Sequence, residues 1–247
     1  MKLKDFFIRN DKVALAFSGG VDSSYLLYAG KKYGADIMPY FIKTPFQPEF
    51  ELEDAKALAS SLGVRIKLIE LDNLSIEEVA RNLDDRCYYC KKTIFNKIIE
   101  EAGKDGYNLI VDGTNASDSY DDRPGMKAIQ ELGVVSPLRE AGLTKEDIRK
   151  LSREAGLFTG DKPSYSCLAT RIFTGQRIRL EDLKKVEEAE KFLMDMGFKD
   201  FRVRVRDKDA RLEFKSEDME KAFKVRKEIY ETLSINFETV SLDLGGR

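Results

Sequence analysis

The stretch Val13–Ser24, which reads VALAFSGGVDSS, decides the fold of this chain. Its first five residues are apolar, which is typical of a buried strand in a parallel sheet. Gly19 and Gly20 then allow a tight turn, and the apolar residues that follow from Tyr25 begin a helix that ends near Gly34. We therefore predict a strand over residues 12–17 that leads through a glycine turn directly into a helix.

Strands and helices keep alternating over the first two thirds of the chain. The further predicted strands are Asp36–Ile42, Val64–Leu71, Asn108–Val111 and a brief one at Val134–Val135, and the further predicted helices are Glu51–Leu62, Cys87–Ala102, a short one from Arg123-Pro124-Gly125 to Leu132, and Thr144–Ala155. This alternation implies an α/β fold with an open, parallel, Rossmann-like sheet. Such sheets bind ligands at the carboxyl ends of their strands.

The pattern changes near Lys162-Pro163, so we expect a second, smaller α+β domain. Its predicted elements are a helix over Leu180–Met196, alternating strands over Phe201–Arg206 and Arg211–Phe214, a helix over Asp218–Leu233 and a last strand over Ile235–Leu244. We place the domain boundary between residues 171 and 172, giving domains over 1–171 and 172–247. The second domain is short, and we expect it to pack on the first domain or on another subunit and to serve substrate binding or oligomerisation.

Composition excludes several classes of function. The chain has 247 residues, no histidine and three cysteines, and its 42 lysines and arginines nearly balance 44 aspartates and glutamates. Without histidine there is no Ser-His-Asp or Cys-His nucleophile and no His-ligated zinc. The net charge of −2 disfavours nucleic acid as a partner. No stretch approaches the roughly 20 apolar residues of a membrane span, and we expect a reduced, cytoplasmic protein with no membrane partner.

The segment Ser18-Gly19-Gly20-Val21-Asp22-Ser23-Ser24 predicts a phosphate-binding loop. Its glycines can present backbone N–H groups to an anion, its serines add hydroxyl donors, and the helix N-terminus contributes its positive dipole end. Asp22 is suited to hold Mg²⁺ against phosphates or to cap the helix. The loop lacks the lysine of a Walker A motif and the GxGxxG spacing of nicotinamide-binding proteins. The plain alternative is a glycine-rich helix cap.

The three cysteines are Cys87, Cys90 and Cys167. Cys87 and Cys90 lie three residues apart at the start of a predicted helix, so both sulfurs can face one target. Four interpretations remain open: a zinc site completed by a carboxylate, a CxxC disulfide, three unrelated thiols, or a 4Fe-4S cluster with three protein ligands. We favour the cluster, because three ligands leave one iron free to bind sulfide.

Several arginines are candidates for anion binding. On the alternating strand, Arg202, Arg204 and Arg206 share one face and predict a phosphate site, with Arg206 the weakest candidate. A solvated face paired with carboxylates such as Glu213 is the alternative. Arg171 is suited either to polarise an acylated intermediate or to form a plain salt bridge.

The phosphate loop resembles the motif SGGxDS of the ATP pyrophosphatase, or PP-loop, superfamily (adenine nucleotide alpha hydrolase type). The resemblance implies that ATP is cleaved between its α and β phosphates and that AMP activates an oxygen of the acceptor. It also implies that Lys43-Thr44 and the turn Asp112-Gly113-Thr114-Asn115 line the adenine and phosphate pocket, and Arg123 is a further candidate to reach ATP or substrate.

Over essentially its whole length the chain resembles the LarE family of ATP-dependent sulfur transferases. The matching segments are SGGVDSS, RCYYCK at Arg86–Lys91, DDRPG at Asp121–Gly125, PLREAGLTKEDIR at Pro137–Arg149, KPSYSCLATR at Lys162–Arg171 and the FRVRVR strand. The resemblance implies that the substrate is pyridinium-3,5-biscarboxylate mononucleotide, which becomes a thiocarboxylate during synthesis of the nickel-pincer nucleotide of lactate racemase. It further implies a homo-oligomer, a trimer or hexamer.

In single-cysteine LarE proteins the residue matching Cys167 gives up its own sulfur. The present chain also carries Cys87 and Cys90, so it resembles the three-cysteine branch, in which the cluster carries the sulfide. Two other functions stay open: a tRNA thiolase of the same superfamily, and a non-catalytic module that binds adenine nucleotides. Amidotransferase-type synthetases for NAD or GMP leave the cysteines unexplained.

Overall fold

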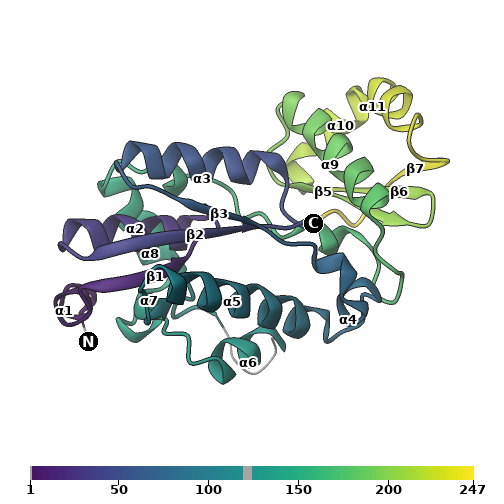
Figure 1. Cartoon of the computed structure of the whole chain (residues 1–247). Coiled ribbons are helices and arrows are strands. Elements are labelled where there is room, and N and C mark those ends of the chain that lie inside the picture. The colour runs from purple at the N-terminus through teal and green to yellow at the C-terminus, as the bar shows by residue number, and fades with distance from the viewer. Residues whose placement is uncertain (1, 119–123) are drawn as a thin grey trace. The chain divides into compact units, whose positions relative to one another are not determined.

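The computed structural model describes residues 2–118 and 124–247 and divides the chain into two compact units (Figure 1). The first unit comprises the residues up to Asn73 together with Asp85–Tyr165, and the second comprises Leu74–Asp84 together with Ser166–Arg247. The second unit therefore begins six residues before the predicted boundary. It also takes in a short segment, 74–84, from the middle of the first unit.

The first unit is built from alternating strands and helices. In chain order its elements are α1 (Leu3–Arg9), β1 (Lys12–Ala16), α2 (Val21–Lys32), β2 (Asp36–Lys43), α3 (Glu49–Ser61), β3 (Lys67–Glu70), α5 (Arg86–Lys104), β4 (Ile110–Val111), α6 (Pro124–Glu131), α7 (Pro137–Glu140) and α8 (Lys145–Glu154). The strands form a parallel sheet in the order β3-β2-β1-β4. The predicted open parallel α/β fold is confirmed. The predicted fifth strand is reduced to one parallel bridge between Val111 and Val135.

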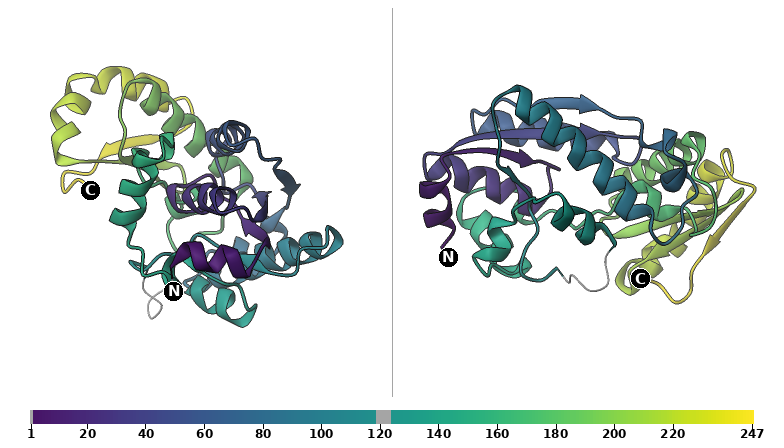
Figure 2. Two further views of the ribbon diagram at one scale, coloured as in Figure 1. Left: turned by 90° about the vertical axis from the view of Figure 1, so that its left-hand side faces the viewer. Right: turned by 60° about the horizontal axis from the view of Figure 1, so that its bottom comes forward.

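Alternation along the central strand explains how the sheet is buried on both faces. Val13 and Leu15 of β1 point into a core formed with α1, α2, α3, α7 and α8, whereas Ala14 points into a second core formed with α5 and α6. Figure 2 shows these helices covering the two faces. Successive side chains of a strand point to opposite faces, so an uninterrupted apolar run is what a doubly covered strand requires.

The second unit is a small α+β assembly, as predicted. Its elements are α4 (Glu77–Ala80), α9 (Leu180–Asp195), β5 (Phe201–Arg206), β6 (Asp209–Phe214), α10 (Met219–Lys224), α11 (Arg226–Leu233) and β7 (Thr239–Leu242). β5 and β6 are antiparallel, and β7 joins β6 in parallel. The segment 74–84 is held here by the buried Asn82, whose amide donates to the carbonyls of Ile172, Phe173 and Gln176 at 2.8–3.3 Å.

No helix in the described ranges is both long and apolar enough to cross a bilayer.

Candidate functional site

The loop Ser18–Ser24 connects β1 to α2, as predicted, and its side chains fix its own shape. Ser23 Oγ accepts a hydrogen bond from the backbone N–H of Ser18 at 3.3 Å and donates to the carbonyl of Gly20 at 3.2 Å. Ser18 Oγ in turn accepts from the N–H of Gly20. Gly20 is the N-cap of α2 and Val21 its first residue, so the free N–H groups and the positive end of the helix lie at this loop.

Two glycines make close packing around the loop possible. Gly19 has φ +73°, and a side chain there would also meet the backbone carbonyl of Glu51 at 3.1 Å. Gly113, which follows β4, lies against the start of α2, where a Cβ would come within 2.9 Å of the backbone nitrogen of Ser23. The turn after β4 therefore packs directly under the loop, as the parallel sheet requires at the carboxyl ends of its strands.

Asp22, the predicted Mg²⁺ ligand, is held by Asn115, which belongs to the turn predicted to line the pocket, and by Lys145, for which no role was predicted. Asn115 Nδ2 donates to Asp22 Oδ1 at 3.3 Å, and Lys145 Nζ forms an ion pair with Asp22 Oδ2. Lys145 is the first residue of α8, which is capped by the reciprocal bonds between Thr144 and Asp147. The capped helix start was visible in the sequence, but the fold alone brings it to Asp22.

A pocket of about 330 Å³ opens beside the loop, a size suited to part of a nucleotide. Apolar side chains of α5 and β2 form one wall, and Ser18, Ser23, Asp112 and Thr114 contribute polar groups. The remaining polar residues lining it are Gln47, Glu51, Lys91 and Asp118. Asp112 is buried and accepts hydrogen bonds from Thr114 Oγ1 at 2.5 Å and from Ser136 Oγ at 2.7 Å, which fixes the turn after β4.

Lys43 and Thr44 form hydrogen bonds within the turn that follows β2. Thr44 is buried, and its hydroxyl donates to Gln47 Oε1 at 2.7 Å. Lys43 Nζ donates to the Gln47 carbonyl at 2.7 Å and lies 3.1 Å from Glu49. Among the described residues, Gln47 lines the pocket, whereas Lys43 and Thr44 do not.

Ser24 and Arg123 are the two remaining residues predicted for the site. Ser24 is fully buried, and its hydroxyl has no hydrogen-bond partner within the described ranges. Arg123 lies outside the described residues.

None of the three cysteines, all of which lie in the described residues, forms a disulfide bond. Cys87 and Cys90 occupy the first turns of α5, where Arg86 Nη2 donates to Cys87 Sγ at 3.7 Å and Asn73 Nδ2 donates to Cys90 Sγ at 3.4 Å. Cys167 belongs to the second unit and directly precedes a 3₁₀ turn over Leu168–Arg171. Over residues 2–118 and 124–247, no three cysteine, histidine or carboxylate side chains are grouped to hold a metal ion. The three-cysteine cluster therefore stays a prediction.

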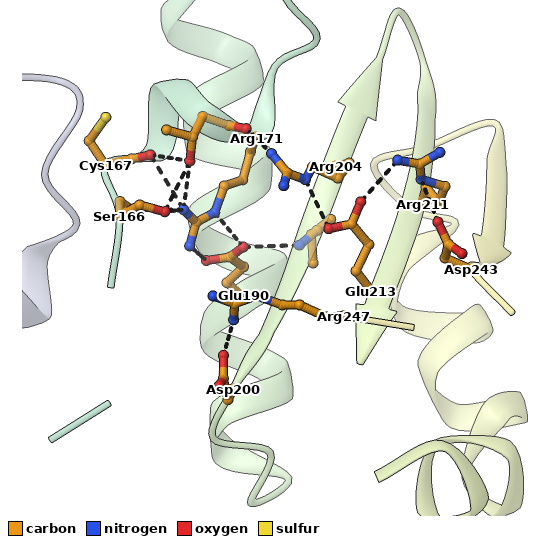
Figure 3. Close-up of polar contacts among 12 residues, drawn as sticks. Ser166, Cys167, Arg171, Glu190, Asp200, Arg204, Arg211, Glu213, Asp243 and Arg247 are labelled. Carbon is orange, nitrogen blue, oxygen red and sulfur yellow. Dashed lines mark hydrogen bonds and ion pairs between the residues drawn. The ribbon is translucent and has the colours of Figure 1, made fainter. Parts of the chain in front are cut away.

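Arg171 forms a buried ion pair, the alternative considered for it above (Figure 3). Its Nε and Nη2 donate to the two carboxylate oxygens of Glu190 at 2.8 and 2.9 Å, and both side chains are 1 % exposed. Its Nη1 donates to the Ser166 carbonyl at 2.7 Å and contacts the Cys167 carbonyl at 3.4 Å. The guanidinium is thus enclosed and engaged with its own unit. These contacts position the turn that carries Cys167, and a role of Arg171 in polarising an acylated intermediate stays a prediction.

The arginines of β5 have different environments. Arg204 Nε donates to Glu213 Oε2 at 3.0 Å, and Arg211 donates to the other oxygen of the same carboxylate (Figure 3). Arg202 is half-buried and forms no ion pair within the part of the chain that is described. Burial, and then the charges of Arg204 and Arg171, lower the pKa of Arg202. Neither Arg202 nor Arg206 forms an ion pair in the described residues, but Arg202 is half-buried whereas Arg206 is exposed and lies 5.9 Å from the ring centre of Phe173.

Comparison with known proteins finds relatives whose similarity extends over most of this chain and most of their own length. No family model matches it. An uncharacterised protein of Synechocystis sp. is 34 % identical, covering 99 % of this chain and 92 % of the relative. The pyridinium-3,5-bisthiocarboxylic acid mononucleotide synthase of Lactiplantibacillus plantarum is 32 % identical, covering 95 % of this chain and 86 % of that protein. A tRNA-specific 2-thiouridylase of Thermotoga petrophila is 25 % identical over 61 % of this chain and 54 % of its own length.

The similarity to the synthase spans both units, whereas the similarity to the thiouridylase covers less of both proteins. Together with the parallel sheet and the SGGVDSS loop between β1 and α2, these comparisons show that the protein belongs to the LarE family within the PP-loop superfamily.

Proposed function

We propose that this protein is an ATP-dependent sulfur transferase that converts a carboxylate of pyridinium-3,5-biscarboxylate mononucleotide into a thiocarboxylate. The observation that carries the proposal is the phosphate loop, which opens at the carboxyl edge of the sheet onto a pocket lined by Ser18 and Ser23. Relatives that are a thiocarboxylate synthase and a tRNA thiolase support sulfur transfer as the general reaction. The proposal that the product is a thiocarboxylate, made for the nickel-pincer cofactor, rests on the similarity to the synthase.

In the first step the loop holds the phosphates of ATP. A substrate carboxylate oxygen attacks the α-phosphorus, and the bond from that phosphorus to the bridging oxygen of the β-phosphate breaks. Pyrophosphate leaves with the oxygen and the electron pair, and the substrate becomes an acyl adenylate. The N–H groups at the start of α2 stabilise the phosphate charge. Asp22 supplies one carboxylate that, with phosphate oxygens, would hold Mg²⁺, and the bound ion would neutralise phosphate charge.

In the second step a sulfur nucleophile attacks the acyl carbon. The carbon–oxygen bond to AMP breaks, and AMP leaves with the electron pair. We propose that Cys87, Cys90 and Cys167 together supply this sulfur. A 4Fe-4S cluster bound by three thiolates would supply sulfide on its open iron. Cys87 and Cys90, three residues apart on α5, would provide two of the three ligands, and Cys167 would provide the third.

The second unit is proposed to bind the substrate through its phosphate. Arg202 is half-buried and has no ion pair in the described residues, and Arg204 beside it is partly neutralised by Glu213. A guanidinium with free donors binds phosphate oxygens in a bidentate manner. We expect these two arginines to bind the mononucleotide phosphate, with Arg202 contributing more. We also propose that the protein acts as a homo-oligomer.

The test of the first step is pyrophosphate release from ATP in the presence of Mg²⁺ and the biscarboxylate mononucleotide. We expect release by the wild-type protein and none by the variant Asp22→Ala. Release by Asp22→Ala at the wild-type rate would remove Asp22 from the mechanism. Bound nucleotide without any release by the wild-type protein would instead indicate a nucleotide-binding module.

The test of the sulfur source is the content of iron and acid-labile sulfide after anaerobic reconstitution. Binding of about four irons per chain, lost when any one cysteine is replaced by alanine, supports the cluster. No iron, together with conversion of Cys167 to dehydroalanine during turnover, would show that Cys167 gives up its own sulfur.

A further inference from the structure

The segment 74–84 lies between two stretches of the first unit in the sequence but folds with the second unit, where Asn82 secures it. Asn82 is fully buried and has a backbone φ of +58°, a left-handed conformation that asparagine tolerates better than most residues. Its Nδ2 group donates to the carbonyls of Ile172 at 3.3 Å, Phe173 at 2.8 Å and Gln176 at 3.1 Å. Burying an amide without partners is costly, so these bonds are what maintains the residue in this conformation.

Further contacts join the same two chain segments. The backbone N–H of Gly175 donates to the Asn82 carbonyl at 2.9 Å. Arg177 forms a two-point ion pair with Glu77 at 2.8 and 2.9 Å, although both side chains are more than half exposed. An exposed ion pair contributes little to stability, so the buried amide is the main contact. Together with the three amide bonds, these contacts form what we call the Asn82 clamp.

The clamp joins the chain that leads into Cys87 to the chain that leads out of Cys167. Cys87 follows Asn82 by five residues, and Cys167 precedes Ile172 by five residues. An extended chain spans at most about 3.6 Å per residue, so the covalent chain alone keeps each cysteine Cα within about 18 Å of the clamp. The 3₁₀ turn over Leu168–Arg171 shortens the second span, because such a turn advances only about 2 Å per residue.

Without the clamp, the path along the chain between these two thiols is much longer. Cys87 and Cys167 are eighty residues apart in the sequence, whereas the path through the clamp has five residues on each side. When two groups are joined by a tether, the effective concentration of one near the other falls as the tether lengthens. The clamp therefore raises the effective concentration of the Cys167 thiol near Cys87.

We propose that Asn82 is a positioning residue of the sulfur-transfer site, which keeps Cys167 within reach of Cys87 and Cys90. The inference rests on the proposed function, in which the three cysteines act together. Asn82 acts through the two chain segments that it joins and contacts neither substrate nor sulfur. Cys90 needs no tether of its own, because it follows Cys87 by three residues in α5 and so shares its helix face.

The test is titration of the reduced protein with arsenite, followed by the near-ultraviolet absorption of the arsenic–sulfur bonds. Arsenite binds three thiolates at once when they converge, and it requires neither iron nor sulfide. Cys167→Ala gives the reference for binding by two thiols. We expect Asn82→Gly to lower the wild-type affinity by about tenfold, toward that of Cys167→Ala, because the tether becomes longer. Glycine adopts the same positive φ, so this variant removes the amide without adding backbone strain.

Asp207→Gly is the matched control, because Asp207 is an exposed residue of the same unit with a φ of +54°. It should bind arsenite as the wild-type protein does. If Asn82→Gly does not fold, Glu77→Arg opens the clamp from its exposed side by placing a second cation against Arg177. We expect a loss of several-fold in this variant and none in Glu78→Arg, which makes the same change of charge at the next exposed position.

Wild-type arsenite affinity in a folded Asn82→Gly, or in Glu77→Arg where Asn82→Gly does not fold, would overturn the inference. The proposed function would stand in that case, provided that Cys167→Ala binds arsenite more weakly than the wild-type protein does. Equal binding by the wild-type protein and Cys167→Ala would show that the three thiols do not converge. That result would contradict both the inference and the three cysteines as the joint source of sulfur.

Discussion

Arg171 and Glu190 form a two-point ion pair in which both side chains are 99 % shielded from solvent. Glu190 also accepts the backbone N–H of Val203 at 3.0 Å, so one carboxylate joins α9, β5 and the turn that carries Cys167. Desolvating two charges is costly, and such a pair is maintained only when its geometry is good. The pair therefore fixes the position of the Cys167 turn within its unit.

Replacement of Glu190 by alanine should be strongly destabilising. It leaves the buried guanidinium of Arg171 without its counter-ion, a change that typically lowers the free energy of unfolding by about 3–5 kcal/mol. Glu190→Gln keeps one of the two acceptor oxygens and should cost less. Denaturant unfolding of the two variants measures the difference. An alanine variant as stable as the wild-type protein would show that the pair does not hold the unit together.

Gly113→Ala should weaken ATP binding through steric overlap alone. The added Cβ would come within 2.9 Å of Ser23 N, so α2 must move away from the turn after β4. Overpacking of this kind costs about 1–3 kcal/mol, which corresponds to roughly a tenfold or greater loss of affinity when it falls on the site. Equilibrium binding of ATP measures the loss.

Gly103→Ala is the control for this change, because a Cβ at Gly103 in α5 meets no atom within 4 Å in the described structure. Alanine is favoured over glycine inside a helix by about 0.5–1 kcal/mol. The control should therefore unfold at a slightly higher temperature and bind ATP normally. Equal loss of ATP binding in both variants would argue against the packing explanation.

The sheet and the loop were predictable because they depend on local patterns. The apolar run at Val13–Phe17 and the glycines at 19 and 20 give both the strand and the turn, and the predicted parallel arrangement is confirmed. Of the two partners of Asp22, Asn115 belongs to the turn predicted to line the same pocket, whereas Lys145 lies far away in the sequence and meets Asp22 only through the fold. For the same reason nothing in the local sequence showed that residues 74–84 join the second unit.

The sequence predicted that the arginines of β5 share one face, but it did not predict the neighbours of each arginine. Alternation placed Arg202, Arg204 and Arg206 on one face, but the difference between them depends on their neighbours across the sheet. Glu213 lies directly opposite Arg202 in the register of β5 and β6, but its carboxylate pairs diagonally with Arg204 and with Arg211 of its own strand. Neither the register nor this choice of partner can be read from the sequence of one strand.

Arg202→Ala should weaken binding of the biscarboxylate mononucleotide, whereas Arg206→Ala should not. Both variants remove one positive charge from the same face of β5, but Arg202 is half-buried whereas Arg206 is exposed. Loss of a charge-assisted contact to phosphate predicts about a tenfold lower affinity for Arg202→Ala. Titration of the mononucleotide measures it, and equal effects of the two variants would show that only net charge matters.

Glu101 on α5 makes the stability of the first unit sensitive to acid. Hydrogen bonds from Lys104, Lys97 and Lys67 lower the pKa of Glu101 from its ordinary value of 4.5 to about 2. Because the pKa is lower in the folded protein, the stabilisation is present above about pH 4.5 and is lost as the pH falls toward 2. Glu101→Gln should therefore unfold at a lower temperature than the wild-type protein at pH 7, and the gap should close in acid. A gap that does not depend on pH would contradict this assignment.

The most direct test of the central claim is mass spectrometry of the biscarboxylate mononucleotide after anaerobic incubation with the reconstituted protein, ATP and Mg²⁺. The proposed function predicts a product in which sulfur has replaced one carboxylate oxygen, formed together with AMP and pyrophosphate in equal amounts. Cleavage of ATP to AMP and pyrophosphate with the mononucleotide unchanged, and sulfur found instead on added tRNA, would contradict it.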